Sequence, residues 1–448
     1  MAVNTEPLKN QADLVQRGLT DLRAEDAELA AILDAEVTRQ QRTLSLVSSC
    51  AAQPRTLVAS ASALVNVTAE GMPGRRQGAG CENVDLVETL AIRRARELFG
   101  AQYANVQSHS SSNATYQVLT ALLEPGDTLL GMAVEHGGDH TQGSPAAFSG
   151  AYYKAIQYGT TSEGLIDYDK VRRLALAHRP RVILCGATAY SRFVDFERFR
   201  EIADEAGAIL LADISQIAGL VATGRHPSPI DFAHVTTTCT HTQLAGPRGG
   251  LILSGRDANT KIPGLRTTFS RLLDQAVYPR MQDAPAANMI AAKAAALGYA
   301  QSAQFDACME RIRRTADAMA SALQAQDYEV VGGRSENHTV LVRLRGGITG
   351  VIAQSALEQC GIIVNKYRVP GETRSSLITS GLRIGTAALA QRYLDGEECR
   401  AVVDLICRIL DNVMPLGEQD YTLESALAEQ FRLQVEGLCT NYPIADYV

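Results

Sequence analysis

The chain has 448 residues, of which 46% are hydrophobic and 20% are charged, and its formal net charge is −7. This length and composition predict a globular protein, and we expect two domains. The acidic balance and the lack of a basic cluster with interleaved aromatic residues argue against nucleic acid as the main partner. The nine cysteines are scattered without close pairs, which predicts buried thiols rather than disulfides or a metal site. No apolar run is long enough to span a membrane, and Met1 to Gln16 resembles neither a signal peptide nor a transit peptide, so we expect a cytoplasmic protein without a membrane partner.

The first element is a helical arm, assigned to residues 1–45. Five apolar side chains recur there at helical spacing among acidic residues: Leu19, Leu22, Leu29, Ile32 and Leu33. Such an arm is too thin to fold alone.

Residues 46–286 alternate helical segments with short apolar runs. The clearest runs, Arg181–Cys185 and Ala208–Ala212, have the composition of strands that are buried on both faces. Between them, Phe196–Ala206 has the pattern of a connecting helix. The alternation predicts an α/β domain in which helices wrap a mostly parallel sheet, and such sheets bind ligands beyond the carboxyl ends of their strands.

Residues 287–448 begin with an alanine-rich helix. Two strand-like runs follow, Val340–Leu344 and Gly361–Val364, before further helices complete the chain. We therefore expect a small α+β C-terminal domain. The chain shows no tandem repeat and no low-complexity linker.

Two segments place polar side chains where a sheet of this type binds ligands. Asp213 follows the strand 209–212, at a point where a carboxylate can hold a protonated ring nitrogen. Ser110, Ser111 and Ser112 precede a helix expected over 115–123, and hydroxyls and free amides at a helix N-terminus bind anions. A helix cap and a serine-rich N-terminus without a ligand remain the ordinary alternatives.

Two further residues are weaker candidates on their own. His136 lies beside Gly137 and Gly138, which would allow a ligand to approach the backbone. Arg383 could receive a carboxylate through two hydrogen bonds. The ordinary alternatives are a structural role for the histidine and an interdomain salt bridge for the arginine. The choice between these and a ligand site therefore depends on the order of all the candidate segments along the chain.

That order resembles serine hydroxymethyltransferase from about Leu46 to Arg392, without large gaps. The most similar segments are Ala101–Gln107, Leu123–Thr128, Gly143–Pro145, Phe148–Gly150, Glu201–Asp204, Ile217–Ala222 and Gly246–Gly250. The resemblance implies a fold type I, aminotransferase-like architecture with a mostly parallel seven-stranded-type sheet and a small C-terminal domain. It also implies a pyridoxal-phosphate site and a homodimer whose active sites are shared across the subunit interface.

The resemblance assigns a role to each matching residue. Asp213 would pair with the pyridine nitrogen, His136 would stack on the ring, and Ser110 and Ser112, with Ser111 between them, would bind the phosphate. Thr188 conservatively replaces the serine that contacts the ring hydroxyl. The remaining matches are Ser49 and Arg383 for the substrate carboxylate, Glu70 as the acid or base, and His241 and Arg248 beside the cofactor.

The departures from the family pattern are equally specific. The position after His241 is Thr242, where the family has the lysine that holds pyridoxal phosphate as a Schiff base. Gln216 replaces a histidine after the Asp213 segment, and Tyr367 replaces an asparagine near the folate ring. Further departures are Thr68, Gln77 and Gly78 in place of tyrosines, Cys50 and Ala51 in a Ser-Glu-Asn motif, and Pro279–Pro285 in place of a glycine-rich phosphate loop.

A threonine can neither hold the aldehyde covalently nor expel product by reforming that bond. Six lysines exist in the chain and none lies in the anchor motif, so Lys366, beside Tyr367, is the one to examine as a substitute. We weigh three hypotheses. The first is a transferase of one-carbon or hydroxymethyl units that keeps a folate-type or amino-acid-like carboxylate substrate and dispenses with covalent pyridoxal phosphate. The second is an enzyme that holds pyridoxal or pyridoxamine phosphate noncovalently for amino-acid C–C bond chemistry, and the third is a noncatalytic scaffold or regulatory dimer partner.

Overall fold

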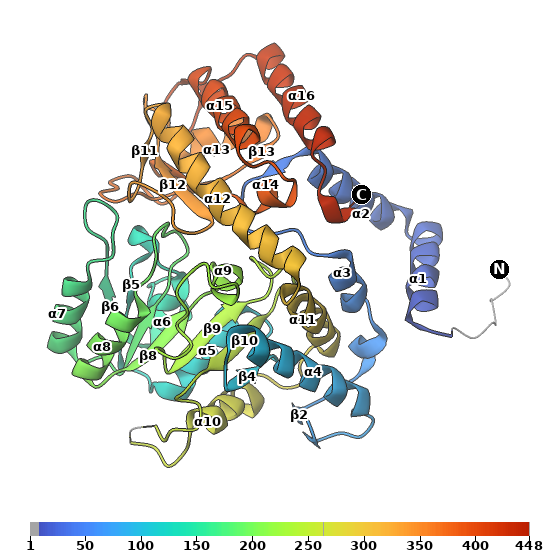
Figure 1. Ribbon diagram of the computed structural model, residues 1–448, viewed down its shortest axis with the longest axis vertical. Helices are drawn as coiled ribbons and strands as arrows, with labels where there is room; N and C mark the ends of the chain where they lie inside the picture. The colour runs from blue at the N-terminus through green and yellow to red at the C-terminus, as the bar shows by residue number, and fades with distance from the viewer. Residues whose placement is uncertain (1–8, 263, 448) are drawn as a thin grey trace.

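Two β-sheets organise the computed structural model of the protein, which describes residues 9–262 and 264–447 (Figure 1). The first half of the polar stretch Met1–Gln16 therefore lies outside the described residues. The larger sheet and its helices form the large lobe, and the smaller sheet with the C-terminal helices forms the small lobe. No helix among the described residues is long and apolar enough to cross a membrane.

The large lobe is built on a seven-stranded sheet with the order β4-β10-β9-β8-β7-β5-β6. Its strands are β4 (Tyr103–Asn105), β5 (Thr128–Met132), β6 (Lys154–Tyr158), β7 (Val182–Cys185), β8 (Ile209–Asp213), β9 (Val235–Cys239) and β10 (Gly250–Ser254). Neighbouring strands from β6 to β9 are parallel, and β10 runs antiparallel to both β9 and β4. This topology confirms the predicted α/β class and the mostly parallel sheet.

The apolar runs form strands because each buries both faces. In β7, Ile183 and Cys185 belong to one core cluster, whereas Val182 and Leu184 point into the cluster on the opposite face. The helices of the first face are α4 (Glu82–Phe99), α7 (Tyr168–His178), α8 (Phe196–Ala206), α9 (Ala218–Ala222) and α11 (Ala287–Ala300). The second face is covered by α5 (Ser111–Leu122) and α10 (Phe269–Gln275).

Capping residues set the ends of α8, which matches the predicted helix. The Asp195 side chain accepts a hydrogen bond from the Arg198 N–H, and Gly207 ends the helix in a left-handed conformation at φ +69°. The chain then enters β8, whose last residue is Asp213. Local sequence therefore places Asp213 at the carboxyl end of a central strand.

The small lobe contains an antiparallel four-stranded sheet with the order β11-β12-β15-β14. Its strands are β11 (Glu329–Val330), β12 (Thr339–Arg343), β14 (Asn365–Tyr367) and β15 (Gly381–Gly385), and its helices are α12 (Ala303–Ala325), α13 (Gly350–Gln359), α14 (Ala387–Gln391), α15 (Glu397–Asp411) and α16 (Ser425–Asn441). The predicted strand 340–344 is thus present one residue earlier. The predicted strand 361–364 shortens to β13 (Ile362–Ile363), which pairs in parallel with β1 (Leu44–Ser45) from the N-terminal arm.

Shorter elements connect these parts. They are α3 (Pro54–Ser60), η1 (Ala63–Asn66), β2 (Gly71–Met72), β3 (Arg75–Arg76), η2 (Val134–His136), η3 (His140–Gln142), α6 (Phe148–Tyr152), the π-helical turn η4 (Ala276–Met281), β16 (Met414–Pro415), β17 (Tyr421–Thr422) and η5 (Ala445–Tyr447).

The N-terminal arm consists of α1 (Gln11–Glu25) and α2 (Ala27–Arg42), and it projects to one side of both lobes (Figure 1). No residue of α1 is buried, and Ala30 is the one buried residue of α2. The exposed apolar side chains of the arm are Leu14, Leu19, Leu29, Ile32, Leu33 and Val37. The arm therefore leaves an apolar surface uncovered within one chain.

Candidate active site

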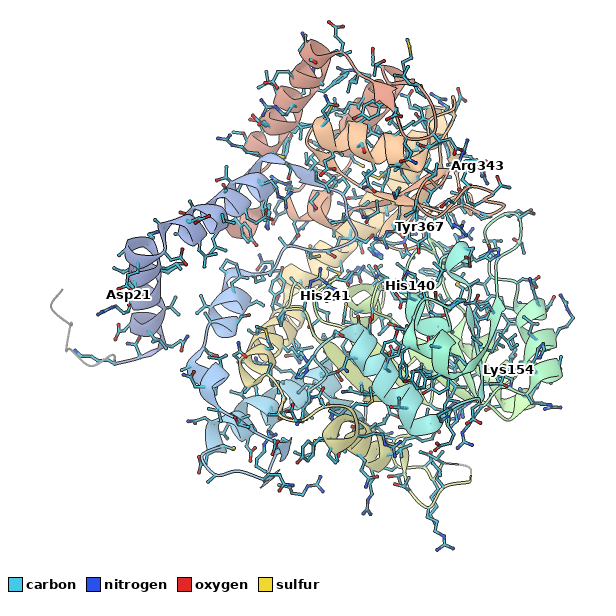
Figure 2. The ribbon with its side chains drawn as sticks, turned by 180° about the vertical axis from the view of Figure 1, so that it is seen from behind. Asp21, His140, Lys154, His241, Arg343 and Tyr367 are labelled. Carbon is cyan, nitrogen blue, oxygen red and sulfur yellow. The ribbon has the colours of Figure 1, made fainter. Side chains whose placement is uncertain are left out.

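A cavity opens where the carboxyl ends of β7, β8 and β9 meet the N-terminus of α5. Its empty volume, including its mouth, is about 400 Å³. The lining residues are Ser111, Ser112, Asp139, Thr141, Gln142, Ala187, Thr188, Asp213, Ser215, Gln216, Cys239, His241 and Thr242. In Figure 2, His241 and His140 lie in the middle of the molecule, below Tyr367 of the small lobe. The location is the one expected for ligand binding by a sheet of this type.

Asp213 faces this cavity from the end of β8. One of its carboxylate oxygens accepts a hydrogen bond from the Ser215 N–H at 2.8 Å. Burial and the nearby Asp139 carboxylate raise the pKa of Asp213 to about 6. Gly186, at φ +120°, allows this close packing, because a Cβ there would lie 2.0 Å from the Asp213 carbonyl oxygen. Asp213 is therefore placed to pair with a cationic ring nitrogen.

Asp139 is a second carboxylate in the same cavity. Its Oδ1 accepts hydrogen bonds from the Thr141 N–H at 2.9 Å and the Thr141 hydroxyl at 2.8 Å. Its Oδ2 accepts a hydrogen bond from the Thr188 hydroxyl at 3.0 Å. Three donors hold this carboxylate in a fixed orientation, and sequence reasoning did not identify it as a site residue.

The sequence prediction for His136 needs correction. Its Nδ1 lies 2.9 Å from the Thr160 hydroxyl, and its ring packs against Gly159, outside the cavity that contains Asp213. Gly137 and Gly138 turn the chain between the two residues, so Asp139, three positions later, faces the cavity instead. His136 is therefore not placed to stack on a ring bound beside Asp213.

Thr242 occupies the floor of the cavity beside β9. Its side chain is 3% exposed, and its hydroxyl lies 2.8 Å from the Cys239 thiol. The thiol also contacts the Ser215 carbonyl oxygen at 3.3 Å. The anchor position thus carries a hydroxyl and a neutral thiol, since burial raises the pKa of Cys239, and neither group can replace an amine.

His241 lines the cavity next to Thr242. Burial, with a smaller effect of Arg248, lowers the pKa of His241 to about 4, so the imidazole is neutral near pH 7. The guanidinium of the exposed Arg248 lies 3.4 Å from its Nε2, whereas Nδ1 has no hydrogen-bond partner. Because a guanidinium can only donate, Nε2 is the acceptor and Nδ1 carries the proton of the neutral ring, so Nδ1–H is an unpartnered donor that can give a hydrogen bond to a bound ligand.

The N-terminus of α5 forms one wall of the cavity. The Ser110 hydroxyl caps this helix by accepting a hydrogen bond from the Asn113 N–H at 3.0 Å, while Ser111 and Ser112 line the cavity. Beneath this loop, the buried Lys293 donates hydrogen bonds to three carbonyl oxygens, those of Val106, Ser108 and Gly250. Lys293 therefore joins the serine loop to the start of β10, and burial lowers its pKa to about 7.

Arg383 approaches the cavity from β15 of the small lobe. Its guanidinium donates to the Thr188 carbonyl oxygen at 2.9 Å and to the Asn365 side chain at 2.8 Å. It has no carboxylate partner within the described residues, and its buried Nε has no hydrogen-bond partner. Tyr367 lies against it, with the guanidinium carbon 5.5 Å from the ring centroid, and burial raises the pKa of Tyr367 to about 12.

A second cavity adjoins the first on the small-lobe side and shares Asp139 and Thr188 with it. Tyr367 and Lys366 are among its other lining residues. The Lys366 ammonium donates to the Leu377 carbonyl oxygen at 2.6 Å, and Lys366 does not line the cavity that contains Thr242.

Glu70 and Ser49 lie outside the Asp213 cavity of their own chain. The loop that carries Glu70 is fixed by Arg76, which donates to the carbonyl oxygens of Ala69 and Gly71. Ser49 borders a separate groove, although the next residue, Cys50, donates its N–H to the Thr242 carbonyl oxygen at 2.7 Å.

The segment expected to replace the glycine-rich loop, 279–285, lies against α5. Arg280 donates to the Thr120 carbonyl oxygen at 2.7 Å, and Gln282 contacts both Gln107 and Gln117. Arg280 is therefore engaged by a helix within its own chain.

The structure brings together seven of the predicted site residues at one cavity. They are Ser111, Ser112, Thr188, Asp213, Gln216, His241 and Thr242. Of the predicted residues, Ser110, Arg248 and Arg383 border it through a cap or a hydrogen bond, whereas His136 does not. The sequence feature that could have identified Asp139 as a site residue is its position between the glycine pair and His140 in the run His136–His140. Within the described residues, no group of three or more His, Cys, Asp and Glu side chains is arranged to hold a metal ion.

The sheet order and the cavity at the carboxyl ends of its strands define a fold type I α/β architecture. The sequence profile described as serine hydroxymethyltransferase matches residues 22–406. The chain belongs to the serine hydroxymethyltransferase family. It is 46% identical over 426 residues to serine hydroxymethyltransferase 1 of Pseudomonas aeruginosa, covering 94% of this chain and 98% of that protein. It is also 47% identical over 421 residues to serine hydroxymethyltransferase of Coxiella burnetii, covering 94% and 96% of the two chains.

Proposed function

We propose that this protein is an enzyme of the hydroxymethyl or one-carbon transferase kind that acts on a folate-type or amino-acid-like carboxylate substrate without covalently bound pyridoxal phosphate. The observation that carries the proposal is a cavity that keeps its ligand-binding groups while Thr242 takes the anchor position. The alternative in which pyridoxal or pyridoxamine phosphate binds noncovalently is favoured by the placement of Asp213.

Three features of the cavity fit a pyridoxal-type ring held noncovalently. Asp213 presents a carboxylate at the strand end, Ser111 and Ser112 lie at a helix N-terminus, and His241 has an unpartnered ring nitrogen. Such a ring, when bound, would withdraw electrons from an amino-acid substrate. The protein would then orient the ring through Asp213 and donate a hydrogen bond to the bound ligand from His241 Nδ1–H.

Arg383 is the group that would receive a substrate carboxylate. Its Nε has no hydrogen-bond partner and no carboxylate pairs with it among the described residues, so a carboxylate bound beside Thr188 would find a guanidinium without a counter-charge. A buried arginine without an anion is costly, and a bound carboxylate would offset that cost.

The role of Glu70 requires a second copy of the chain. Glu70 does not line the cavity of its own chain, so an acid or base function would place it in the cavity of a partner subunit. The exposed apolar side chains of the N-terminal arm, together with Leu57 and Val58 of α3, offer a surface for that homodimer. Sedimentation of the full chain beside a chain that lacks residues 1–42 would measure whether the arm contributes to the dimer.

The experiment that tests the proposal compares the natural chain with Thr242→Lys and with Thr242→Ser as a matched control. Each protein is incubated with pyridoxal phosphate, reduced with borohydride and digested, and the peptide containing residue 242 is weighed. We expect an adduct at this peptide in Thr242→Lys and none in the other two. Absorbance titration with pyridoxal phosphate, with and without serine or glycine, and calorimetry with tetrahydrofolate then identify which ligand binds the natural chain.

A spectral change that requires the amino acid would support the noncovalent alternative. Heat with tetrahydrofolate and none with pyridoxal phosphate would support one-carbon transfer without that cofactor. No response to any of these ligands would refute both enzymatic proposals and favour a noncatalytic scaffold or regulatory dimer partner.

A further inference from the structure

The cavity beside β8 has an unusual balance of charged side chains. Two of its lining residues are acidic, Asp139 and Asp213, and none of them is lysine or arginine. His241 is neutral near pH 7, because burial and Arg248 lower its pKa to about 4. Thr242 contributes a hydroxyl. The side chains that face a ligand here are therefore acidic or neutral.

The carboxylates of Asp139 and Asp213 interact electrostatically, and each is held by its own set of hydrogen-bond donors. The charge of Asp139 contributes to the raised pKa of Asp213, so the two groups interact across the cavity. Asp213 is fixed by the Ser215 N–H, and Asp139 by the hydroxyls of Thr141 and Thr188 and the Thr141 N–H. These contacts are hydrogen bonds from neutral donors, and neither carboxylate has a cationic partner among the described residues.

A ligand that satisfies both carboxylates must offer two positively charged groups. A ring N–H⁺ meets the requirement of Asp213, and a protonated primary amine meets that of Asp139. An aldehyde in the same place offers no charge and no proton, and the missing lysine removes the only reason for an aldehyde to be held there covalently. Asp139 also borders the second cavity, where a substrate would enter beside Tyr367.

We propose that Asp139 determines the form of the ligand, so that this cavity selects a pyridoxamine-phosphate-type molecule, with a protonated aminomethyl group, over its aldehyde and deoxy counterparts. The inference rests on the noncovalent alternative of the proposed function and deepens it. Asp213 holds the ring nitrogen, and Asp139 accepts the hydrogen bond of the ammonium group. Thr188 orients Asp139 through its hydroxyl.

The test is calorimetry of the full-length protein with two probes, pyridoxamine 5′-phosphate and 4′-deoxypyridoxine 5′-phosphate. The second probe carries a methyl group where the first carries the charged aminomethyl group, and neither can react with lysine side chains. We expect the natural chain to bind the amine at least about tenfold more tightly, since a charge pair in a partly buried site exceeds the energy of one tenfold step.

Asp139→Asn removes the charge and keeps a side chain able to cap η3, so the fold should be retained. We expect the preference for the amine to fall to about twofold or less in this variant. Glu135→Gln is the matched control, because it removes a carboxylate from the same loop that is paired with Arg368 outside the cavity. The preference should be unchanged in this control. If Asp139→Asn does not fold, Asp139→Ser takes its place, since serine also caps a helix.

Equal affinity for the two probes in the natural chain would overturn the inference and leave the proposed function standing. The same holds if Asp139→Asn keeps the full preference. If neither probe binds while tetrahydrofolate does, the inference fails and one-carbon transfer without the cofactor remains. If neither the probes nor tetrahydrofolate bind, both the inference and the proposed function fail.

Discussion

Replacing Arg76 by methionine tests the buried network that holds the loop of Glu70. The Arg76 side chain is 4% exposed, and its partner Glu88 is 1% exposed, with 2.5 Å between the guanidinium and the carboxylate. Arg76 also pairs with Asp85 and donates to the carbonyl oxygens on both sides of Glu70. Burial raises the pKa of Glu88 although Arg76 opposes that effect, so Arg76→Met leaves an acid that is costly to ionise.

Removal of one partner from a buried ion pair costs roughly 3–5 kcal/mol. We therefore expect Arg76→Met to lower the free energy of unfolding by about this amount, measured by urea denaturation at one fixed protein concentration because the family resemblance implies a dimer. Arg314→Met is the control, since Arg314 is 61% exposed and pairs with Asp395. It should cost about 1 kcal/mol or less. Equal losses in the two variants would show that the buried network does not stabilise the loop.

Three further changes test other parts of the site. In the natural chain, the contribution of Asp213 to the free energy of unfolding should fall as the pH rises from 3.8 to about 6, because the folded state binds the extra proton in that window. Asp213→Asn should abolish this fall, and urea denaturation of both proteins at pH 4 and pH 7 would measure it. In the natural chain, stability should rise with pH between about pH 7 and pH 10.5, because the unfolded chain binds more protons there, and Lys293→Met should remove this rise. Urea denaturation of both proteins at pH 7 and pH 9 would contradict the prediction if the variant gains as much stability as the natural chain. Gly250→Ala would place a Cβ 2.3 Å from the Ser110 carbonyl oxygen and should cost roughly 1–3 kcal/mol in urea denaturation. Gly437→Ala in α16, where a Cβ would meet no atom within 4 Å, is the control and should be neutral or slightly stabilising.

Local sequence was sufficient to predict the central strands of the large sheet and the carboxylate at the end of one of them. The predicted runs 181–185 and 208–212 each begin one residue before the observed strands β7 and β8, which form because their apolar residues alternate between two buried faces. Asp213 follows directly, so its position at the carboxyl end needed no knowledge of distant contacts. Helix 196–206 was predictable for the same reason, since Asp195 and Gly207 mark its ends.

Tertiary packing decided what local sequence could not. His136 and Asp139 are three residues apart, and sequence alone favoured the imidazole as the ring contact. Gly137 and Gly138 fit tightly against the carbonyl oxygens of Ala189 and Met132, and the turn they form directs the two side chains into different spaces. A sequence pattern cannot specify that direction, because it depends on strands that are distant along the chain.

The placement of Glu70 was also beyond local sequence. Its motif identifies a candidate acid, but the loop is held at the end of β4 through Gln107, Arg76 and Glu88, and Glu70 does not line the cavity. The proposed homodimer would bring Glu70 to the Asp213 site of a second copy of the chain.

The two unpaired carboxylates argue against a cavity that has lost its ligand. Asp213 raises the cost of folding, because its burial and the nearby charge of Asp139 both disfavour its ionised form. An asparagine at either position would keep most of the hydrogen bonds and remove the penalty, and a chain free of ligand binding has no physical reason to retain the charges. Burial of the Arg383 guanidinium, whose Nε has no hydrogen-bond partner, also raises the cost of folding, in this case for a positive charge. This guanidinium donates to the Thr188 carbonyl oxygen. A ligand with a cationic end toward Asp139 and Asp213 and a carboxylate toward Arg383 would offset both costs, which is the charge distribution of an amino-acid substrate bound together with an amine-bearing ring.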